Sequence, residues 1–94
     1  MTFAKATRLV FHIPWATSLK DKRQVRRSLI EKTKHRFNVS VSEIGTQDIH
    51  QTLTIGIALA YADAAYGMEE MEKIISFMES ASECELVYVE TFDM

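Results

Sequence analysis

The sequence contains only one cysteine, one proline and three glycines in 94 residues. A single cysteine, Cys84, cannot form an intrachain disulfide or a cysteine-rich metal site. So few glycines leave no glycine-rich loop that could cradle a phosphate. No stretch approaches the roughly 20 apolar residues of a membrane-spanning helix, and the first residues do not resemble a secretion signal. We therefore expect a cytoplasmic protein with no membrane partner and no cofactor.

Length and composition predict one globular domain over residues 1–94. The chain is 47% hydrophobic and 26% charged, which is ordinary for a globular protein and unlike a disordered tail. A chain of this length forms a single hydrophobic core. We expect it to fold on its own.

Charge is segregated along the chain, although the net value is only −2. Residues 20–36 hold eight Lys or Arg against two acids, whereas the remainder holds three against eleven. A local basic segment can attract phosphates even in an acidic protein. A solvated helix face explains the same pattern equally well, so the charge alone does not decide between them.

Alternation of apolar and polar residues predicts four strands. Residues 8–13, 37–42 and 52–61 alternate with a period of two, and residues 86–89 form a short apolar run. Pro14 ends the first strand. The turn-forming sequence Gly-Thr-Gln-Asp at residues 45–48 links the second strand to the third.

Two helices are predicted between the strands. Ser18 can cap a helix over residues 19–36, and Asp63 can cap a second one. The apolar stripe of the first helix is thin, so we expect Lys22 and Lys32 to lay their stems beside the core and carry their charges outward. The second helix has a stripe that we assign to the core, namely Met68, Met71, Ile74, Ile75 and Met78.

The order strand, helix, strand, strand, helix, strand predicts an α+β ferredoxin-like sandwich. Two helices cover one face of a four-stranded antiparallel sheet and leave the other face open. We expect that open face to be small, mildly polar and without an aromatic platform. A second copy or another partner could pack there, or Arg8 could pair with Glu90 or reach a phosphate. The candidate interaction-face residues are Arg8, His12, Gly56, Ala58 and Ala60.

Three segments resemble the YlxP-like family: Ser-Leu-Lys-Asp-Lys-Arg at 18–23, Arg-Phe-Asn-Val-Ser-Val at 36–41, and Gln-Asp at 47–48. The similarity covers essentially the whole chain, including His-Ile-Pro at 12–14. It implies a bacterial protein of unknown function with a ferredoxin-like fold. Genes of this family often lie beside those for translation initiation and ribosome maturation factors, which implies a connection with RNA or the ribosome. Relatives often carry Asp-His where this chain has Gly-Thr at 45–46.

The basic helix is the feature that predicts RNA binding. At about 100° per residue, four of its cations fall within roughly 60° of arc on the outer side. Such cations can follow a phosphate backbone and supply affinity without reading bases. The small residues of strand 52–61 argue against base stacking on the sheet. The predicted partner is ribosomal RNA or a ribosomal subunit, and the candidate contacts are Lys20, Arg23, Arg26, Arg27, Lys34 and Arg36.

No catalytic or metal-binding set is evident in the sequence. His12, His35 and His50 occupy different elements and lack the spacing of a zinc site. His12 could act as an acid or base, although a lone strand histidine more often bonds a neighbour. Residues 47–48 could bind a ligand or simply form a turn. We therefore expect no enzymatic activity, and two hypotheses stay open: an RNA- or ribosome-associated factor, and a protein-interaction or homodimerisation module.

Overall fold

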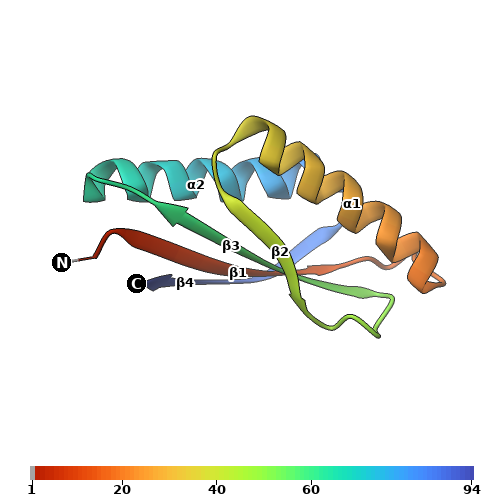
Figure 1. Ribbon diagram of the computed structural model, residues 1–94. Helices are drawn as coiled ribbons and strands as arrows, with labels where there is room; N and C mark the ends of the chain where they lie inside the picture. The colour runs from red at the N-terminus through yellow and green to blue at the C-terminus, as the bar shows by residue number, and fades with distance from the viewer. Residues whose placement is uncertain (1) are drawn as a thin grey trace.

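The computed structural model describes residues 2–94, so Met1 of the predicted domain lies outside the described residues. The predicted ferredoxin-like order is confirmed: the sheet is antiparallel with strand order β2-β3-β1-β4. Both helices lie over one face of it (Figure 1). The elements are β1 (Ala4–His12), α1 (Leu19–Arg36), β2 (Ser40–Gly45), β3 (Thr52–Ala60), α2 (Ala64–Ala81) and β4 (Glu85–Asp93).

The start of α1 is fixed by reciprocal capping. Ser18 Oγ accepts a hydrogen bond from the backbone N–H of Asp21, at 3.2 Å. Asp21 in turn accepts from the backbone N–H and the hydroxyl of Thr17, at 2.9 and 3.0 Å. These bonds to the charged carboxylate hold the pKa of Asp21 below its usual value. The helix therefore begins at the predicted residue because two otherwise unpaired N–H groups find acceptors there.

Three strands differ from those predicted. The first was predicted over residues 8–13, but β1 runs from Ala4 to His12. The second strand was predicted over residues 37–42, but β2 begins at Ser40, because Phe37 and Val39 pack on the core from the connection. The fourth strand was predicted over residues 86–89 and instead extends to Asp93. Pairing partners explain the extension, since β1 already starts at Ala4 and offers its whole length to β4.

The core lies between the sheet and the two helices. Its fully buried members come from β1, β3 and both helices, and the methionine stripe of α2 belongs to it except at one position. Met68 is 56% exposed, so its assignment to the core was wrong. Gly67 takes that inward position because the ring of Tyr61 lies against its backbone. The largest buried side chains are Leu9, Phe11, Ile13, Leu29, Leu53, Ile55, Ile57, Ile74 and Met78.

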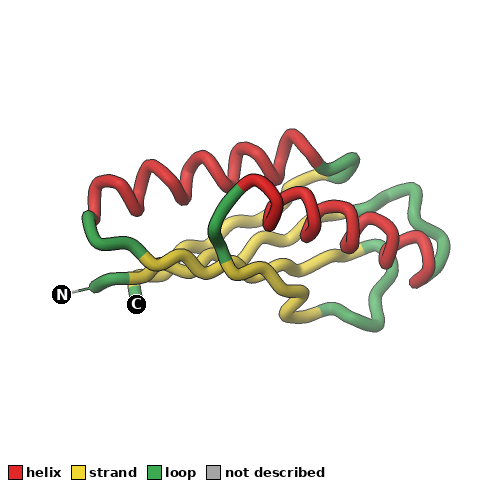
Figure 2. Tube along the Cα trace, turned by 45° about the horizontal axis from the view of Figure 1, so that its top comes forward, coloured by secondary structure: helices red, strands yellow, loops and turns green. Residues whose placement is uncertain are grey.

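The opposite face of the sheet carries no helix. Figure 2 shows α1 and α2 together on one side of the strands, with the loop between β2 and β3 extending beyond the sheet. Neither helix within residues 2–94 combines the length and apolarity needed to cross a bilayer. The fold thus offers two distinct surfaces for binding, the outer side of the helix layer and the open side of the sheet.

Candidate nucleic-acid interface

The outer side of α1 carries four exposed cations, which we call the basic ridge: Lys20, Arg23, Arg27 and Lys34. Within residues 2–94, none of the four forms an ion pair with an acidic side chain. At a rise of 1.5 Å per residue, the ridge is about 21 Å long. Its charges are therefore available to an external anion.

Acidic side chains lie beside the basic ridge and on the neighbouring helix. Glu31 is exposed and, by helical spacing, borders the ridge between Arg27 and Lys34. The exposed acids Glu69, Glu72 and Glu79 belong to α2. A polyanion would therefore meet attraction along α1 and repulsion along α2.

Arg26 lies off the ridge, beside strand β2. Its Nη1 donates to Glu43 Oε1 at 3.1 Å. The other oxygen, Oε2, lies 2.9 Å from Lys22 Nζ, and the side chains of Lys22 and Glu43 are only 3% and 8% exposed. The expectation that Lys22 carries its charge outward is therefore wrong. Glu43 draws the ammonium inward, since a buried charge requires a partner.

Lys22 also binds the loop between β2 and β3. Its Nζ donates hydrogen bonds to the carbonyl of Thr46 and to that of Ile49, the latter at 2.9 Å. The N–H of Ile49 donates to the Thr46 carbonyl at 3.0 Å, which closes a turn with Gln47 and Asp48 at its centre. This bonding favours the turn interpretation of residues 47–48 over the ligand interpretation.

Two of the three segments that resemble the family meet at this place. A depression of about 170 Å³ lies between them. Its walls are formed by residues of the segment 18–23, by Arg26 and Glu43, and by the turn residues 47–48. Segment 36–41 lies beyond it, at the other end of α1. The sequence gives a signal for the inward Glu43, because the alternation of Phe37, Val39 and Val41 continues to residue 43.

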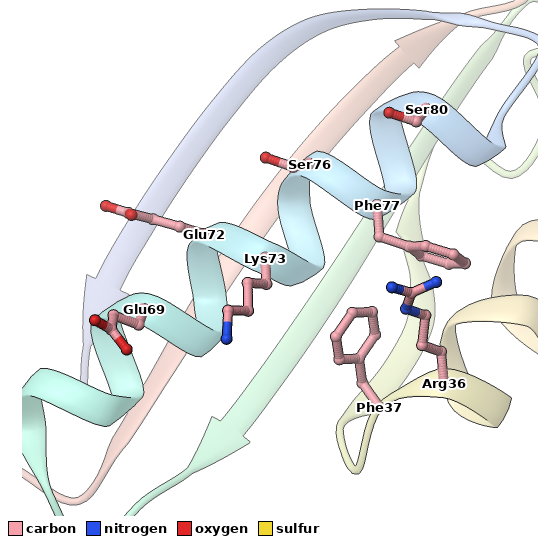
Figure 3. A pocket seen from close by; sticks show the side chains of 8 residues that line it. All are labelled: Arg36, Phe37, Glu69, Glu72, Lys73, Ser76, Phe77 and Ser80. Carbon is pink, nitrogen blue, oxygen red and sulfur yellow. The ribbon is translucent and has the colours of Figure 1, made fainter.

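Arg36 is held by aromatic rings at the end of α1. Its guanidinium lies 5.0 Å from the ring centroid of Phe77 and 5.7 Å from that of Phe37, and Figure 3 shows it between the two rings. The rings themselves pack edge to face at 5.5 Å. These residues border an open groove of about 790 Å³ whose far end carries Glu69 and Glu72 (Figure 3). The guanidinium of Arg36 thus lies against aromatic rings, unlike the cations of the basic ridge.

The charged residues of the open sheet face are paired with each other. Arg8 was expected either to pair with Glu90 or to reach a phosphate. In the structure its Nη2 lies 2.5 Å from Glu90 Oε1, so the ion pair is formed. His12 Nδ1 lies 3.2 Å from Glu85 Oε1. Gly56, Ala58 and Ala60 lie on β3, and the first two pair with Ser42 and Ser40 of β2.

The open face is more apolar than expected. Ile44 and Phe92, at 52% and 45% exposed, flank its small residues, and the exposed ring of Tyr88 lies 6.0 Å from the Arg8 guanidinium. Ile44 follows Ser40 and Ser42 on the same side of β2, and the extension of β4 adds Phe92. The expectation of a mildly polar face was therefore wrong at its edges, where Ile44 and Phe92 are exposed.

Chemistry-bearing side chains are dispersed in the described part of the chain. Residues 2–94 contain no group of three His, Cys, Asp or Glu side chains placed to hold a metal ion. Cys84 is half-buried, and burial together with Glu83 raises the pKa of its thiol, which disfavours a reactive thiolate.

Comparison with known proteins agrees with the fold. The structure defines a small ferredoxin-like α+β domain, and a designed protein with a ferredoxin fold superposes on it with a TM-score of 0.57. That alignment has 10% identity and covers 99% of this chain and 85% of the other. A REP-associated tyrosine transposase bound to a REP hairpin gives a TM-score of 0.48 at 10% identity, over 100% of this chain and 58% of the other. At that score the likeness supports no conclusion.

Sequence comparison gives the family. Residues 5–91 match the family model described as "Protein of unknown function (DUF503)". The "Uncharacterized protein YlxP" of Bacillus subtilis (strain 168) is 36% identical over 76 residues, which are 81% of this chain and 83% of that protein. The chain belongs to this YlxP-like family of unknown function, and the resemblance inferred from its motifs is confirmed.

Proposed function

We propose that this protein is a non-enzymatic, RNA-associated factor of the cytoplasm that contacts the phosphate backbone of structured RNA through α1. The observation that carries the proposal is the basic ridge: four exposed cations, about 21 Å long, without an acidic partner in residues 2–94. Cations so arranged bind phosphates and release counterions.

The ridge is held rigidly, which favours binding. Lys22 and Arg26 fix the inner side of α1 to Glu43 of β2, at 2.9 and 3.1 Å. Capping by Ser18 fixes the first turn of the helix. A polyanion therefore meets cations on a helix that is already in place, and little ordering of backbone is needed on binding.

The six candidate RNA contacts have different roles in this proposal. Lys20, Arg23, Arg27 and Lys34 supply the attraction, whereas Arg26 supports the helix through Glu43. Arg36 is stacked on Phe77, so it contributes at most at the end of the ridge. Backbone contacts of this kind suit a structured RNA, and ribosomal RNA or a ribosomal subunit is the proposed partner.

The second hypothesis, a protein-interaction or homodimerisation module, concerns the opposite face of the sheet. It does not compete with the RNA proposal for residues, because the open-face candidates lie on β1 and β3 and not on α1.

Binding of an RNA hairpin tests the proposal. The probe has a stem of about 16 base pairs, the length that double-stranded RNA-binding domains cover. We expect the slope of log affinity against log salt to fall in magnitude by about 2 in the variant Arg23→Ala with Arg27→Ala, at about one per lost phosphate contact.

The matched control is Lys32→Ala with Lys73→Ala. Both lysines are exposed, and their removal changes the net charge by the same amount away from the ridge. The control should keep the wild-type slope. Equal losses in the two double variants, or no binding by the wild type at low salt, would overturn the proposal.

A further inference from the structure

A groove crosses the open face of the sheet, on the side away from both helices. It encloses about 290 Å³ between Ile44 on one side and Phe92 on the other. The floor consists of small side chains from β1, β2 and β3, namely Ala6, Ser40, Ser42, Gly56 and Ala58.

The walls of the groove follow from backbone features. Ile44 lies on the same side of β2 as Ser40 and Ser42 and covers Gly56, where a Cβ atom on the glycine would lie 2.8 Å from Ile44 Cγ2. On β4, Phe92 pairs with Ala6 of β1, which is too small to cover its ring. Ile44 and Phe92 are therefore about half exposed above a floor of small residues.

Charged side chains of this face lie beside partners from the neighbouring strand. Arg8 is paired with Glu90 at 2.5 Å. His12 Nδ1 lies 3.2 Å from Glu85 Oε1, a contact that is an ion pair only when the ring is protonated. The Arg8 guanidinium is thus already bound to a carboxylate. Exposed apolar side chains beside internally paired charges fit an uncharged partner surface.

The groove and the projecting side chains that fit it occur on the same face. A two-fold axis through the groove lets a side chain such as Ile44 of each copy enter the small-residue floor of the other, as an isologous interface requires. We propose that this face binds a second copy of the chain, sheet against sheet.

The size of the face is sufficient for such a dimer. Three strands of nine residues and one of six, spaced about 4.8 Å apart with about 3.3 Å per residue, give about 500 Å² per copy. The total of about 1,000 Å² reaches the lower limit for a specific interface. Because α1 lies on the other side of the sheet, the dimer leaves both basic ridges exposed (Figure 1).

The oligomeric state of the full chain tests the inference. Light scattering at up to about 100 µM, where a dimer with a micromolar dissociation constant is nearly fully associated, should give twice the 10.8 kDa chain mass. Ala58→Glu places a charge on the groove floor and should give a monomer. Ile44→Ser, which adds no charge, should weaken association by at least tenfold.

The control is Ser80→Glu, which adds the same charge to an exposed position of α2 and should leave the dimer intact. Circular dichroism and thermal melting establish that each variant is folded. A wild-type monomer at the highest concentration overturns the inference. A folded Ala58→Glu variant that stays dimeric also overturns it, because association then uses another surface.

Discussion

The ammonium of Lys22 lies 2.9 Å from the carboxylate of Glu43, and both side chains are buried between α1 and β2. The same ammonium also donates hydrogen bonds to the loop carbonyls of Thr46 and Ile49. One side chain thus ties together the helix that carries the basic ridge, the strand beside it and the loop between β2 and β3.

Removing Lys22 alone should be costly. Lys22→Met leaves Glu43 with Arg26 as its remaining partner and leaves two loop carbonyls without their donor. We expect a loss of about 3 kcal/mol in the free energy of unfolding, as for other broken buried pairs. Urea denaturation measures it. The double variant Lys22→Met with Glu43→Leu should lose at least about 1 kcal/mol less than the sum of the single losses, and additive losses would contradict the pairing.

Gly67→Ala should destabilise the protein although alanine is the better helix former. A Cβ at residue 67 would lie 2.6 Å from the ring of Tyr61, so the ring or the helix must shift. Overpacking costs about 1 to 3 kcal/mol, against about 1 kcal/mol gained in helix propensity. In a Tyr61→Ala background the same change should become neutral or stabilising by about 1 kcal/mol. Denaturation of the four proteins gives the result, and an unchanged sign in that background refutes the contact.

The contribution of Asp21 to stability should depend on pH. Hydrogen bonds from Thr17 lower the pKa of this carboxyl in the folded state. Because the pKa is lower in the folded state, the ionised carboxylate stabilises the protein at pH values above the unfolded pKa of about 3.9. This stabilisation is lost as the pH falls through the folded-state pKa. The difference in stability between wild type and Asp21→Asn should be constant from pH 7 to about 4 and shrink below that. A difference independent of pH down to 2 would show that the carboxylate charge plays no part.

The strands and helices were predictable because the core follows simple periodicity. The alternation of Leu9, Phe11 and Ile13, and that of Leu53, Ile55 and Ile57, matches the buried residues of β1 and β3. Ser18 marked the start of α1 because a short polar side chain there satisfies an N–H group that the helix leaves free. These features depend on neighbours in sequence, so they can be read without the fold.

The site could be predicted only in part, because its decisive contacts join distant residues. The arc of exposed cations on α1 follows from helical geometry and agrees with their exposure. The inward course of Lys22 depends on Glu43, which is 21 residues away in the sequence. Alternation along β2 placed Glu43 inward and Ile44 outward, but nothing near Lys22 in the sequence indicated that its ammonium pairs with Glu43, and the position of Phe92 depends on how far β4 pairs with β1.

Glu31 provides a gain-of-affinity test of the path that RNA follows. It is exposed and borders the basic ridge, where its carboxylate would repel a phosphate backbone. We expect Glu31→Gln to strengthen binding of the RNA hairpin about threefold at low salt, because surface charge interactions are worth about 0.2 to 1 kcal/mol. Glu79→Gln on α2 is the control with the same charge change, and equal effects of the two variants would mean that RNA does not follow α1.

Co-sedimentation with separated ribosomal subunits, at low and at moderate salt, is the decisive test of a ribosome-linked role for α1. We expect the wild-type protein to sediment with one subunit. The Arg23→Ala with Arg27→Ala variant should not sediment with it, whereas the Lys32→Ala with Lys73→Ala variant should. Absence of wild-type association at both salt concentrations, or association that survives loss of Arg23 and Arg27, would contradict a ribosome-linked role for α1.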